Sequence, residues 1–383
     1  MIKSAKTILV ACDWYDRRIY RGIARYASEH DWHLSPYLFS DRFVPRGWPA
    51  DGAITSYGNV LGKFILSLDM PKVDISVCDI AETIPRVTVN NEAISRLAAE
   101  HFLARGFRHF AFYSWSIVDV NQIRMSSFFE ALKEAGVPAS SLHILKQPPA
   151  RIMSDWDAHM EAIVGQLHDL PRPLAVFAGQ DNLGATLVEV CARSGIHVPE
   201  EVAVLGVDNI EFLCDCLMVP LSSIDTRLDD LGYEAAHQLD RLMNKKIKKT
   251  AKPILIDPKE VVCRQSTDVL AVEHPAVVKA LRFTKENFHN PITLDDIAAY
   301  AGMSKRGMEK AFVKCLGRTP AVELRRIRLD SAKRMLTETN EKVETIAREC
   351  GYSNSSNLSF AFNKETSMSP RAYRKHFRAS RGE

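Results

Sequence analysis

An internal repeat near the C-terminus constrains the fold of this chain more than any other feature of the sequence. The segment Leu294–Ser304 returns as Val343–Ser353, and both copies keep an alanine four residues before a glycine and a serine two residues after it. The small alanine lets a second helix approach closely, and Gly302 and Gly351 can adopt the left-handed conformation that ends a helix. Each copy therefore predicts two helices at a steep angle, a helix-turn-helix unit whose second helix can enter a DNA major groove.

The residues around the repeat complete the pattern of an all-helical domain. Each copy is followed by a helix with an apolar face, formed by Met308 and Phe312 or by Leu358 and Phe362, and Ser304 is placed to cap the first of these helices. A helix that begins with proline closes both copies. A plain helical bundle is the alternative, and the doubling in a basic segment disfavours it. The predicted helices are Ala276–Phe288, Leu294–Ala301, Lys305–Leu316, Pro320–Thr337, Val343–Cys350, Ser355–Lys364 and Pro370–Phe377.

Charge is distributed unevenly along the chain. The residues from Ala276 onward contain 21 Lys and Arg against 12 Asp and Glu, which leaves 29 against 35 for the preceding part of a chain whose formal net charge is only +3. A slightly acidic body with a basic C-terminal region is expected when only that region meets a polyanion. We therefore expect double-stranded promoter DNA as the partner of the C-terminal region.

The chain before Thr267 alternates short apolar strands with amphipathic helices, which predicts an α/β fold with doubly wound parallel sheets in two lobes. Ligands of such sheets bind at the carboxyl ends of the strands. We expect a ligand-sensing domain over residues 1–268 that crosses between lobes near residues 90 and 220, a linker over 269–275, and a DNA-binding domain over 276–383. The strand patterns are Lys6–Ala11, Gly52–Thr55, Val73–Val77, Arg108–Tyr113, Leu174–Ala178 and Val202–Val207, and the helix patterns include Asp16–Ser28, Asn91–Ala104, Arg124–Ala135, Leu183–Ser194 and Leu228–Leu242.

Other protein classes are disfavoured by what the sequence lacks. Of the eight cysteines only Cys214 and Cys216 are close together, so neither a metal nor another cofactor is expected. No apolar run approaches the roughly 18 residues of a membrane helix, and no signal peptide precedes Thr7–Val10, so we expect a cytoplasmic protein without a membrane partner. Gly58–Lys63 is one residue short of a phosphate-binding loop, and no hydrolase or metalloprotease motif is present, so we expect no enzyme. An α/β enzyme tethered to a DNA-binding tail is the weaker alternative.

The C-terminal region resembles the DNA-binding domain of the AraC/XylS family in the repeat itself, in Arg328–Ala332 and in Ser369–Tyr373. The resemblance implies two recognition helices in successive major grooves on one face of the DNA. It implies base contacts from Arg306, Glu309 and Lys310 in the first helix and from Ser355, Ser356, Asn357 and Phe360 in the second. Basic residues on the linking and terminal helices are expected to contact phosphates, with a solvated surface position as the alternative for each: Arg325, Arg326, Arg371, Arg374 and Lys375.

The N-terminal region resembles the type I periplasmic-binding-protein-like domain of LacI/GalR regulators, without their N-terminal DNA-binding head. The resemblance rests on Arg124–Leu132, Val176–Gly184, Ser194–Asn209 and Pro220–Asp225. It implies a small sugar bound in a cleft between two lobes. The residues expected to bind it are Trp14, Tyr15, Asp16, Arg17, Arg124, Asp181 and Asp208. Alternatives remain open, since Asp181 could cap the following helix, Arg124 could pair with a surface carboxylate, and Trp14 could pack rather than stack.

The pairing of these two domains resembles the xylose operon regulators, on Tyr15–Arg17, Gly206–Glu211, Gly232–Ala236 and Ser266–Asp268 among other segments. The resemblance implies D-xylose or another pentose as effector, a homodimer, and activation of sugar catabolic genes, in which RNA polymerase would be a further partner. A non-sugar effector such as a purine or a peptide is the alternative.

Overall fold

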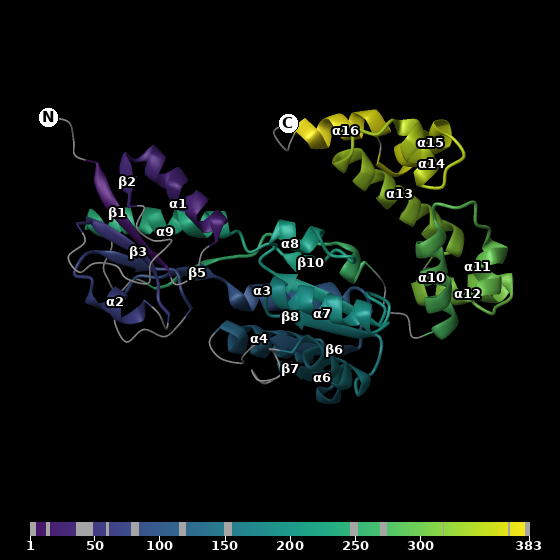
Figure 1. Cartoon of the computed structure of the whole chain (residues 1–383), viewed down its shortest axis with the longest axis horizontal. Coiled ribbons are helices and arrows are strands. Elements are labelled where there is room, and N and C mark those ends of the chain that lie inside the picture. Colours follow the sequence, from purple (N-terminus) through teal and green to yellow (C-terminus); the bar gives the residue numbers. More distant parts are fainter. Residues whose placement is uncertain are drawn as a thin grey trace. The chain divides into compact units, whose positions relative to one another are not determined.

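The chain forms two compact units, Met1–Val269 and Leu270–Glu383 (Figure 1). The structure is a computed structural model, and it describes residues 5–12, 16–35, 49–58, 61–77, 84–114, 120–148, 155–245, 252–268, 274–316, 318–366 and 368–379. Among these residues, every helix is too short or too polar to cross a membrane. Pro275 is the first residue of a helix, and not the end of the linker as expected, because the fixed φ of proline suits that position.

The first unit, Met1–Val269, corresponds to the predicted ligand-sensing domain, is called the sensor unit below, and has two lobes. Its first lobe is built on a parallel sheet with the strand order β2-β1-β3-β4. A separate parallel pair joins β5 to β11. Helix α9 packs along α1 and against the strands of this lobe. The elements are β1 (Lys6–Cys12), α1 (Arg17–Glu29), β2 (Trp32–Leu34), β3 (Gly52–Ser56), α2 (Gly62–Ser67), β4 (Lys72–Asp74), β5 (Val87–Val89), α9 (Leu228–Met243) and β11 (Ile254–Ile256).

The second lobe is built on a six-stranded sheet with the order β12-β10-β9-β8-β6-β7, in which only β12 runs antiparallel. Its elements are α3 (Asn91–Leu103), β6 (His109–Ser114), α4 (Val120–Glu134), β7 (Leu142–Lys146), α6 (Trp156–His168), β8 (Leu174–Ala178), α7 (Asp181–Arg193), β9 (Val202–Val207), α8 (Glu211–Asp215), β10 (Ser222–Ile224) and β12 (Val261–Val262), with 3-10 turns at Ala139–Ser141 and Gln265–Thr267.

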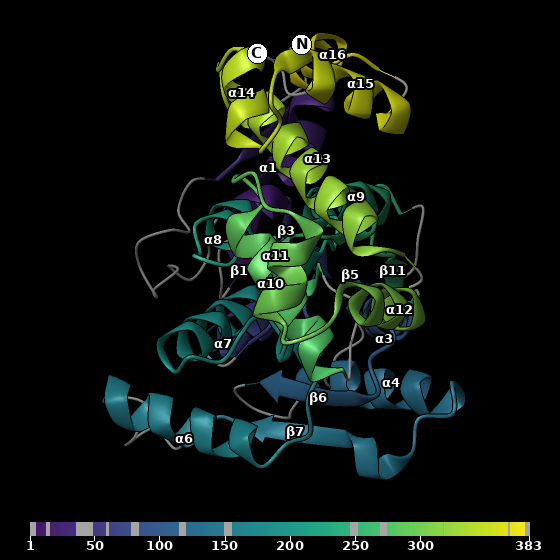
Figure 2. The same ribbon diagram turned by 90° about the vertical axis from the view of Figure 1, so that its right-hand side faces the viewer.

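Both faces of the central strands of this second sheet, β6, β8, β9 and β10, are buried, as expected for a doubly wound parallel sheet. Along β6, Ala111 and Tyr113 join an aliphatic core with α6 and α7. Phe110 and Phe112 point to the opposite face, where their rings pack edge-on in a cluster that includes Phe128 of α4. Figure 2 shows α3 and α4 on one side of β6 and α7 on the other.

The chain crosses between the lobes three times, after β5, after β10 and after β11, because β11 pairs with β5 whereas β12 pairs with β10. Crossings near residues 90 and 220 were predicted from the sequence. The third crossing lies between Ile256 and Val261, and it returns the chain to the second lobe before the unit ends.

In the residues that the structure describes, the second unit is all-helical, and its seven helices begin and end within two residues of the predicted ends. They are α10 (Pro275–Asn287), α11 (Leu294–Tyr300), α12 (Lys305–Leu316), α13 (Pro320–Glu338), α14 (Val343–Glu349), α15 (Ser355–Thr366) and α16 (Pro370–Ala379). Two separate cores are present, one around Met308 and Phe312 and the other around Leu358 and Phe362. Figure 1 shows α13 running from one group of helices to the other, as the linking helix of two helix-turn-helix units.

Candidate functional site

Arg124 and Asp208 meet at the carboxyl ends of the strands of the second lobe. Arg124 is only 4% exposed, so it is not the partner of a surface carboxylate. Its Nε donates to Oδ1 of Asn91 at 2.8 Å, and its Nη1 donates to the carbonyl oxygen of Gly179 at 2.6 Å. Its Nη2 lies 4.0 Å from Oδ1 of Asp208. The guanidinium is therefore held from one side, and its remaining nitrogen faces a carboxylate.

Asp181 lies behind this pair and is engaged with the protein itself. It is 1% exposed and is the first residue of α7. Its Oδ1 accepts a hydrogen bond from the Ser223 hydroxyl at 2.5 Å, and its Oδ2 accepts one from the backbone N–H of Ile210 at 2.7 Å. Burial, reinforced by the nearby charge of Asp208, raises the pKa of Asp181 to about 7. The side chain is thus buried as well as hydrogen-bonded, so a direct contact with a sugar, as predicted, would have to use a remaining lone pair of these oxygens.

The backbone turns sharply at Asp208 and Asn209, immediately after β9. Both residues have positive φ angles, 96° and 49°, which side-chain-bearing residues adopt rarely. The Asp208 carboxylate accepts a hydrogen bond from the hydroxyl of Thr226 at 3.2 Å and keeps 26% of its side-chain surface exposed. Such a corner aims a carboxylate outward from the end of a strand, where a ligand can reach it.

In the first lobe, Asp16 caps helix α1, and it is Arg18 rather than Arg17 that faces the second lobe. Oδ1 of Asp16 accepts from the backbone N–H of Arg18 at 2.8 Å, and the two side chains form an ion pair at 2.9 Å. Arg18 Nη1 donates to the carbonyl oxygens of Asp208 and Asn209, the latter at 3.1 Å. Arg17 is exposed, and the described residues include no partner for its side chain. The predicted ring-stacking residues Trp14 and Tyr15 lie outside the described residues.

Polar amides at the same strand ends were missed from the sequence. Asn91 follows β5 and holds Arg124. The Oδ1 atom of Asn121 is buried against Gly179 and has no hydrogen-bond partner among the described residues. Gln180 stands between Gly179 and Asp181, directly after β8. An amide within three residues of a predicted strand end or helix start is the signal that could have identified them.

The two glycine turns of the second unit have the predicted conformation. Gly302 and Gly351 have φ angles of 67° and 75°. Ser304 caps α12 as predicted, because its Oγ accepts from the backbone N–H of Gly307 at 3.1 Å. In the second copy the cap is Asn354, whose Oδ1 accepts from the N–H of Asn357 at 2.9 Å. The second turn is therefore one residue longer than the first.

This extra residue changes which positions correspond in the two recognition helices, α12 and α15. The buried Met308 and Phe312 correspond to Leu358 and Phe362, an offset of 50 residues, whereas the preceding helices are offset by 49. The predicted base-contacting residues of α12 then correspond to Ser356, Ser359 and Phe360. Ser359 was not predicted, and the predicted Ser355 corresponds to Lys305.

The predicted base-contacting residues lie away from the buried faces of both recognition helices. Arg306 and Lys310 are exposed and Glu309 is half-buried. In α15, Ser355 is half-buried, Ser356 is exposed, and Phe360 is 76% exposed, which is unusual for a large apolar side chain. Asn357 is exposed, but its amide donates to Oγ of Ser353 at 2.7 Å.

The five predicted phosphate-binding residues divide into two groups. Arg326 forms ion pairs with Glu323 and Asp330, both at 2.9 Å. Arg374 donates to the backbone carbonyl oxygens of Leu336 and Glu341, at 3.3 and 2.6 Å. These two arginines brace the unit. The other three are exposed and have no hydrogen bond or ion pair within the described ranges: Arg325, Arg371 and Lys375.

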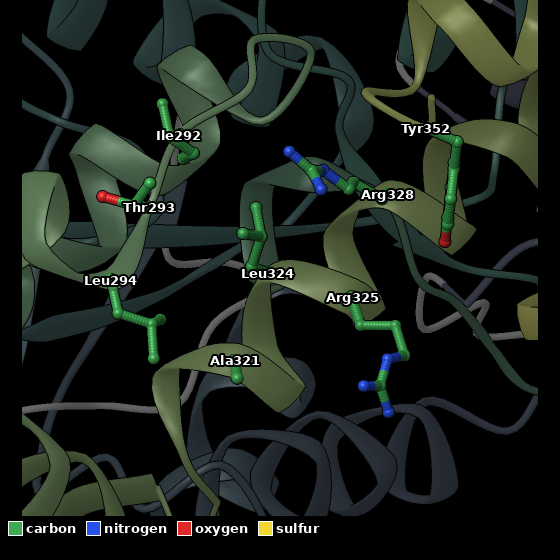
Figure 3. Close-up of a pocket in the computed structure, with 8 residues that line it drawn as sticks. All are labelled: Ile292, Thr293, Leu294, Ala321, Leu324, Arg325, Arg328 and Tyr352. Carbon is green, nitrogen blue, oxygen red and sulfur yellow. The ribbon is translucent and has the colours of Figure 1, made fainter. Parts of the chain in front are cut away.

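A cavity of about 310 Å³ lies at the junction of the two helix-turn-helix units, lined by Ile292, Thr293, Leu294, Ala321, Leu324, Arg325, Arg328 and Tyr352 (Figure 3). Arg328 donates from Nε to the carbonyl oxygen of Phe288 and from Nη2 to that of Asn290, both at 2.8 Å. In Figure 3 the side chain of Arg325 points away from Arg328. The two guanidinium groups do not converge, so the cavity is a junction between units rather than a cradle for an anion.

Family models match both units of the chain. A model described as a periplasmic binding protein-like domain matches residues 99–267, and one described as a helix-turn-helix domain matches residues 297–376. The described part of the chain agrees with both, in the parallel sheets of the sensor unit and the paired helices of the second unit.

Similar proteins share this arrangement over nearly their whole length. The xylose operon regulatory protein of Escherichia coli strain K12 is 26% identical over 373 residues, covering 94% of this chain and 94% of that protein. The protein of the same name from Haemophilus influenzae is 26% identical over 381 residues, covering 94% and 95%. The solved structure of a xylose-binding transcription activator, XylR, aligns with a TM-score of 0.78 at 24% identity, covering 98% of this chain and 99% of that one, and so shows the same fold. The chain is therefore a homologue of the xylose operon regulatory proteins, with a periplasmic binding protein-like domain followed by a helix-turn-helix domain.

Proposed function

We propose that the chain is a sequence-specific DNA-binding transcription regulator, controlled by a pentose that binds between the two lobes of the sensor unit. The observation that carries the proposal is the juxtaposition of Arg124 and Asp208, 4.0 Å apart at the strand ends. A sugar presents neighbouring hydroxyl groups, each of which is both a donor and an acceptor, and a fixed guanidinium beside a carboxylate complements such a pair. Asp16 and Arg18 of the first lobe face the same corner, so a ligand here can touch both lobes.

D-xylose is the first candidate for the effector, because the similar proteins that cover nearly the whole chain carry xylose in their names. A sugar that contacts both lobes binds the closed arrangement better than the open one, and it shifts the balance by this difference in affinity. The shift would change how paired copies of the chain present their DNA-binding units. We propose a homodimer acting in the cytoplasm, with activation of sugar catabolic genes through RNA polymerase as the output.

On the DNA side, α12 and α15 would each occupy a major groove. Arg306 and Lys310 suit guanine, Glu309 can accept from cytosine, and Phe360 suits thymine methyl groups. The first helix therefore reads bases by hydrogen bonds, and the second reads mainly through apolar contact and DNA shape. No catalytic step forms part of this proposal.

The test combines DNA binding with ligand binding. Fragments from upstream of neighbouring genes are titrated with the protein at low salt, with and without D-xylose, L-arabinose, D-ribose or adenine, and sugar affinity is measured by calorimetry. We expect one pentose to bind and to change the DNA affinity. Asp208→Asn should abolish sugar binding, whereas Glu189→Gln, which removes a surface carboxylate on α7, should not. Failure to bind any fragment would refute the regulator, and a response to adenine alone would replace the sugar by a purine.

A further inference from the structure

The corner at Asp208 and Asn209 is held from two sides by arginines that come from different parts of the chain. Two consecutive residues with positive φ persist only where the surroundings impose them. Inside the lobe, the backbone N–H of Asn209 donates to the Ser223 hydroxyl at 2.9 Å, and that of Asp208 donates to the carbonyl oxygen of Ile224 at 3.0 Å. These bonds fix the inner side of the corner, and the arginines act on its outer side.

Arg18 holds the corner from the first lobe. It donates to both carbonyl oxygens of the corner, and its own position is set by two hydrogen bonds to Asp16, at 3.1 and 2.9 Å. Because Arg18 lies on α1 and the corner follows β9, any movement of one lobe against the other acts on this contact. The contact is thus a point where lobe closure reaches the effector site.

Arg264 holds the corner from the last segment of the sensor unit. Its Nη1 donates to Oδ1 of Asn209 at 3.0 Å and to the carbonyl oxygen of Leu221 at 3.1 Å, and its Nε pairs with Asp215 at 2.5 Å. The side chain is only 12% exposed. An arginine in this position presents several donors in a rigid plane, so it ties its backbone to the corner at a defined distance.

The residues after Arg264 form the last described segment before the chain passes to the DNA-binding unit. The backbone N–H of Arg264 itself donates to the Ser222 hydroxyl at 2.8 Å. Ser266 donates from Oγ to the carbonyl oxygen of Val204 at 2.6 Å, and the Thr267 hydroxyl is 2.9 Å from Nε2 of His101. This segment, 264–268, is therefore joined by side-chain hydrogen bonds to the strands next to the corner, up to the unit boundary at Val269.

We propose that Arg264 is the positioning residue that couples the effector site to the end of the sensor unit. This inference rests on the proposed function, in which a sugar binds at Asp208 and closes the lobes. Closure shifts Arg18 against the carbonyl groups of the corner, the side chain of Asn209 carries the shift to Arg264, and Arg264 displaces segment 264–268. Among the described residues, the Arg264 side chain bonds to Asn209, Leu221 and Asp215 and to no predicted effector-binding side chain, so its contribution is to the response and not to sugar affinity.

The test measures how much a saturating sugar changes DNA affinity in the full-length protein. The ratio of the DNA Kd without sugar to that with sugar is expected to differ from one by about 5- to 150-fold in the wild type, the usual range of allosteric coupling. In Arg264→Gln we expect the sugar Kd to stay within about threefold of wild type, while the ratio moves to within about twofold of one. Arg172→Gln is the control, because it breaks another ion pair of the same lobe, with Glu201, and should leave both quantities unchanged.

A second variant, Asn209→Ala, cuts the link at its other end and leaves the bonds of Arg264 to Asp215 and Leu221 in place. Its coupling ratio should also approach one, and adding Arg264→Gln to it should cause no further loss. A wild-type ratio in Arg264→Gln refutes the coupling while the proposed function stands. Loss of sugar binding in a folded Arg264→Gln also refutes it, since the residue would then belong to the binding site. A wild-type protein whose DNA affinity responds to no sugar refutes both proposals.

Discussion

Gly351 ends α14, the first helix of the second helix-turn-helix unit, directly against the carbonyl oxygen of Phe288, which belongs to the first unit. The same oxygen accepts the hydrogen bond from Nε of Arg328 in the linking helix α13. Three elements of the DNA-binding unit thus meet at one carbonyl group. The equivalent glycine of the first unit, Gly302, has open space where a side chain would be. Two positions that look alike in the sequence therefore carry different structural demands.

Replacing the two glycines by alanine should separate these demands. Gly302→Ala should lower the free energy of unfolding by about 1 to 2 kcal/mol, because alanine is strained at positive φ. Gly351→Ala should lower the free energy of unfolding by about 3 kcal/mol or more, because its Cβ would also collide with the carbonyl oxygen of Phe288 and force the two helix-turn-helix units apart. Denaturant unfolding of the full-length protein measures both losses. Equal losses in the two variants would show that the contact with Phe288 imposes no constraint.

The buried Asp181 should make the stability of the sensor unit depend on pH. Burial, together with the Asp208 charge, raises the pKa of Asp181 from a usual value of 3.8 to about 7. Between these values the folded protein retains a proton that the unfolded chain has released, so the free energy of unfolding should fall as pH rises toward 7, by about 1.4 kcal/mol for each pH unit at most. Asp181→Asn should remove this component, as seen in the difference between the two unfolding curves at pH 5 and pH 8.

The variant Asp208→Asn provides an independent check on the raised pKa of Asp181. Removing the neighbouring charge takes away the second cause of the raised pKa, so the pH-dependent fall should end at a lower pH than in the wild type. Glu189→Gln removes a surface carboxylate of α7 and should leave the profile unchanged. If the free energies of unfolding of the wild type and of Asp181→Asn fall in parallel between pH 5 and pH 8, Asp181 is ionised over that whole range.

Glu323 should give the DNA-binding unit the opposite dependence on pH. It is 2% exposed and lies between the guanidinium groups of Arg318 and Arg326. Burial opposes ionisation of Glu323, but the hydrogen bonds from the two arginines prevail and hold its pKa below the usual value. Its stabilising effect is therefore present above the pKa of an unfolded glutamate, about 4.3, and is lost as pH falls through the folded pKa.

The variant Glu323→Gln should accordingly lower the free energy of unfolding at pH 7 by about 3 kcal/mol, because it removes the carboxylate that Arg318 pairs with and one of the two carboxylates that Arg326 pairs with. The loss should shrink as the pH falls below about 4. Glu344→Gln, at an exposed position of α14, serves as control. A loss of the same size at pH 7 and pH 3 would contradict an ionised Glu323.

Local patterns in the sequence identified the elements that fold on local grounds. The seven helices of the DNA-binding unit have caps, prolines or glycines at their ends, and they were predicted within two residues. The longer strands β1, β3, β6, β8 and β9 were found because each carries a short apolar run. The five-residue strand β7 was missed, since it lies at the edge of its sheet and is only partly buried. The short strands β2, β5, β10, β11 and β12 were also missed, since two or three residues become a strand only when a distant partner supplies the hydrogen bonds. The third crossing between lobes depends on two of these strands and was missed with them.

The sequence named several residues of the candidate site, but it did not show how their side chains are arranged. Arg124 and Asp208 were identified by resemblance, and the structure brings them together. Arg17 was predicted from the resemblance, and Arg18 was not considered, because the sequence does not show where a helix turns its first residues. Once Asp16 caps α1, the guanidinium of Arg18 lies beside that cap and reaches the second lobe. The correspondence of Ser359 to Glu309 was missed because the one-residue difference between the two glycine turns shows only in which residues of α12 and α15 are buried.

The phosphate contacts can be separated from the bracing arginines by salt dependence. Arg325→Ala should reduce the slope of log K against log salt by about 0.9, as expected for one lost phosphate contact. Arg326→Ala should leave the slope unchanged and lower stability instead, because this neighbour is committed to Glu323 and Asp330. DNA titrations at four or more salt concentrations, with the two variants side by side, measure both slopes. A smaller slope in Arg326→Ala would place that arginine on the DNA and overturn this division.

The register of the second recognition helix can be tested through Ser359 and Ser355. If the two helices correspond at an offset of 50 residues, Ser359 occupies the place of Glu309 and Ser355 that of Lys305, whose amine is paired with Asp295 at 3.1 Å rather than directed at bases. Ser359→Arg should then change the preferred base at one position of a selected DNA pool, with a discrimination of about 1 to 3 kcal/mol, because arginine favours guanine. Ser355→Arg should strengthen binding to all sequences alike, as an added positive charge near the backbone does. The opposite result, with the new base preference arising in Ser355→Arg, would restore the 49-residue correspondence and mean that α15 meets the groove in a different rotation from α12.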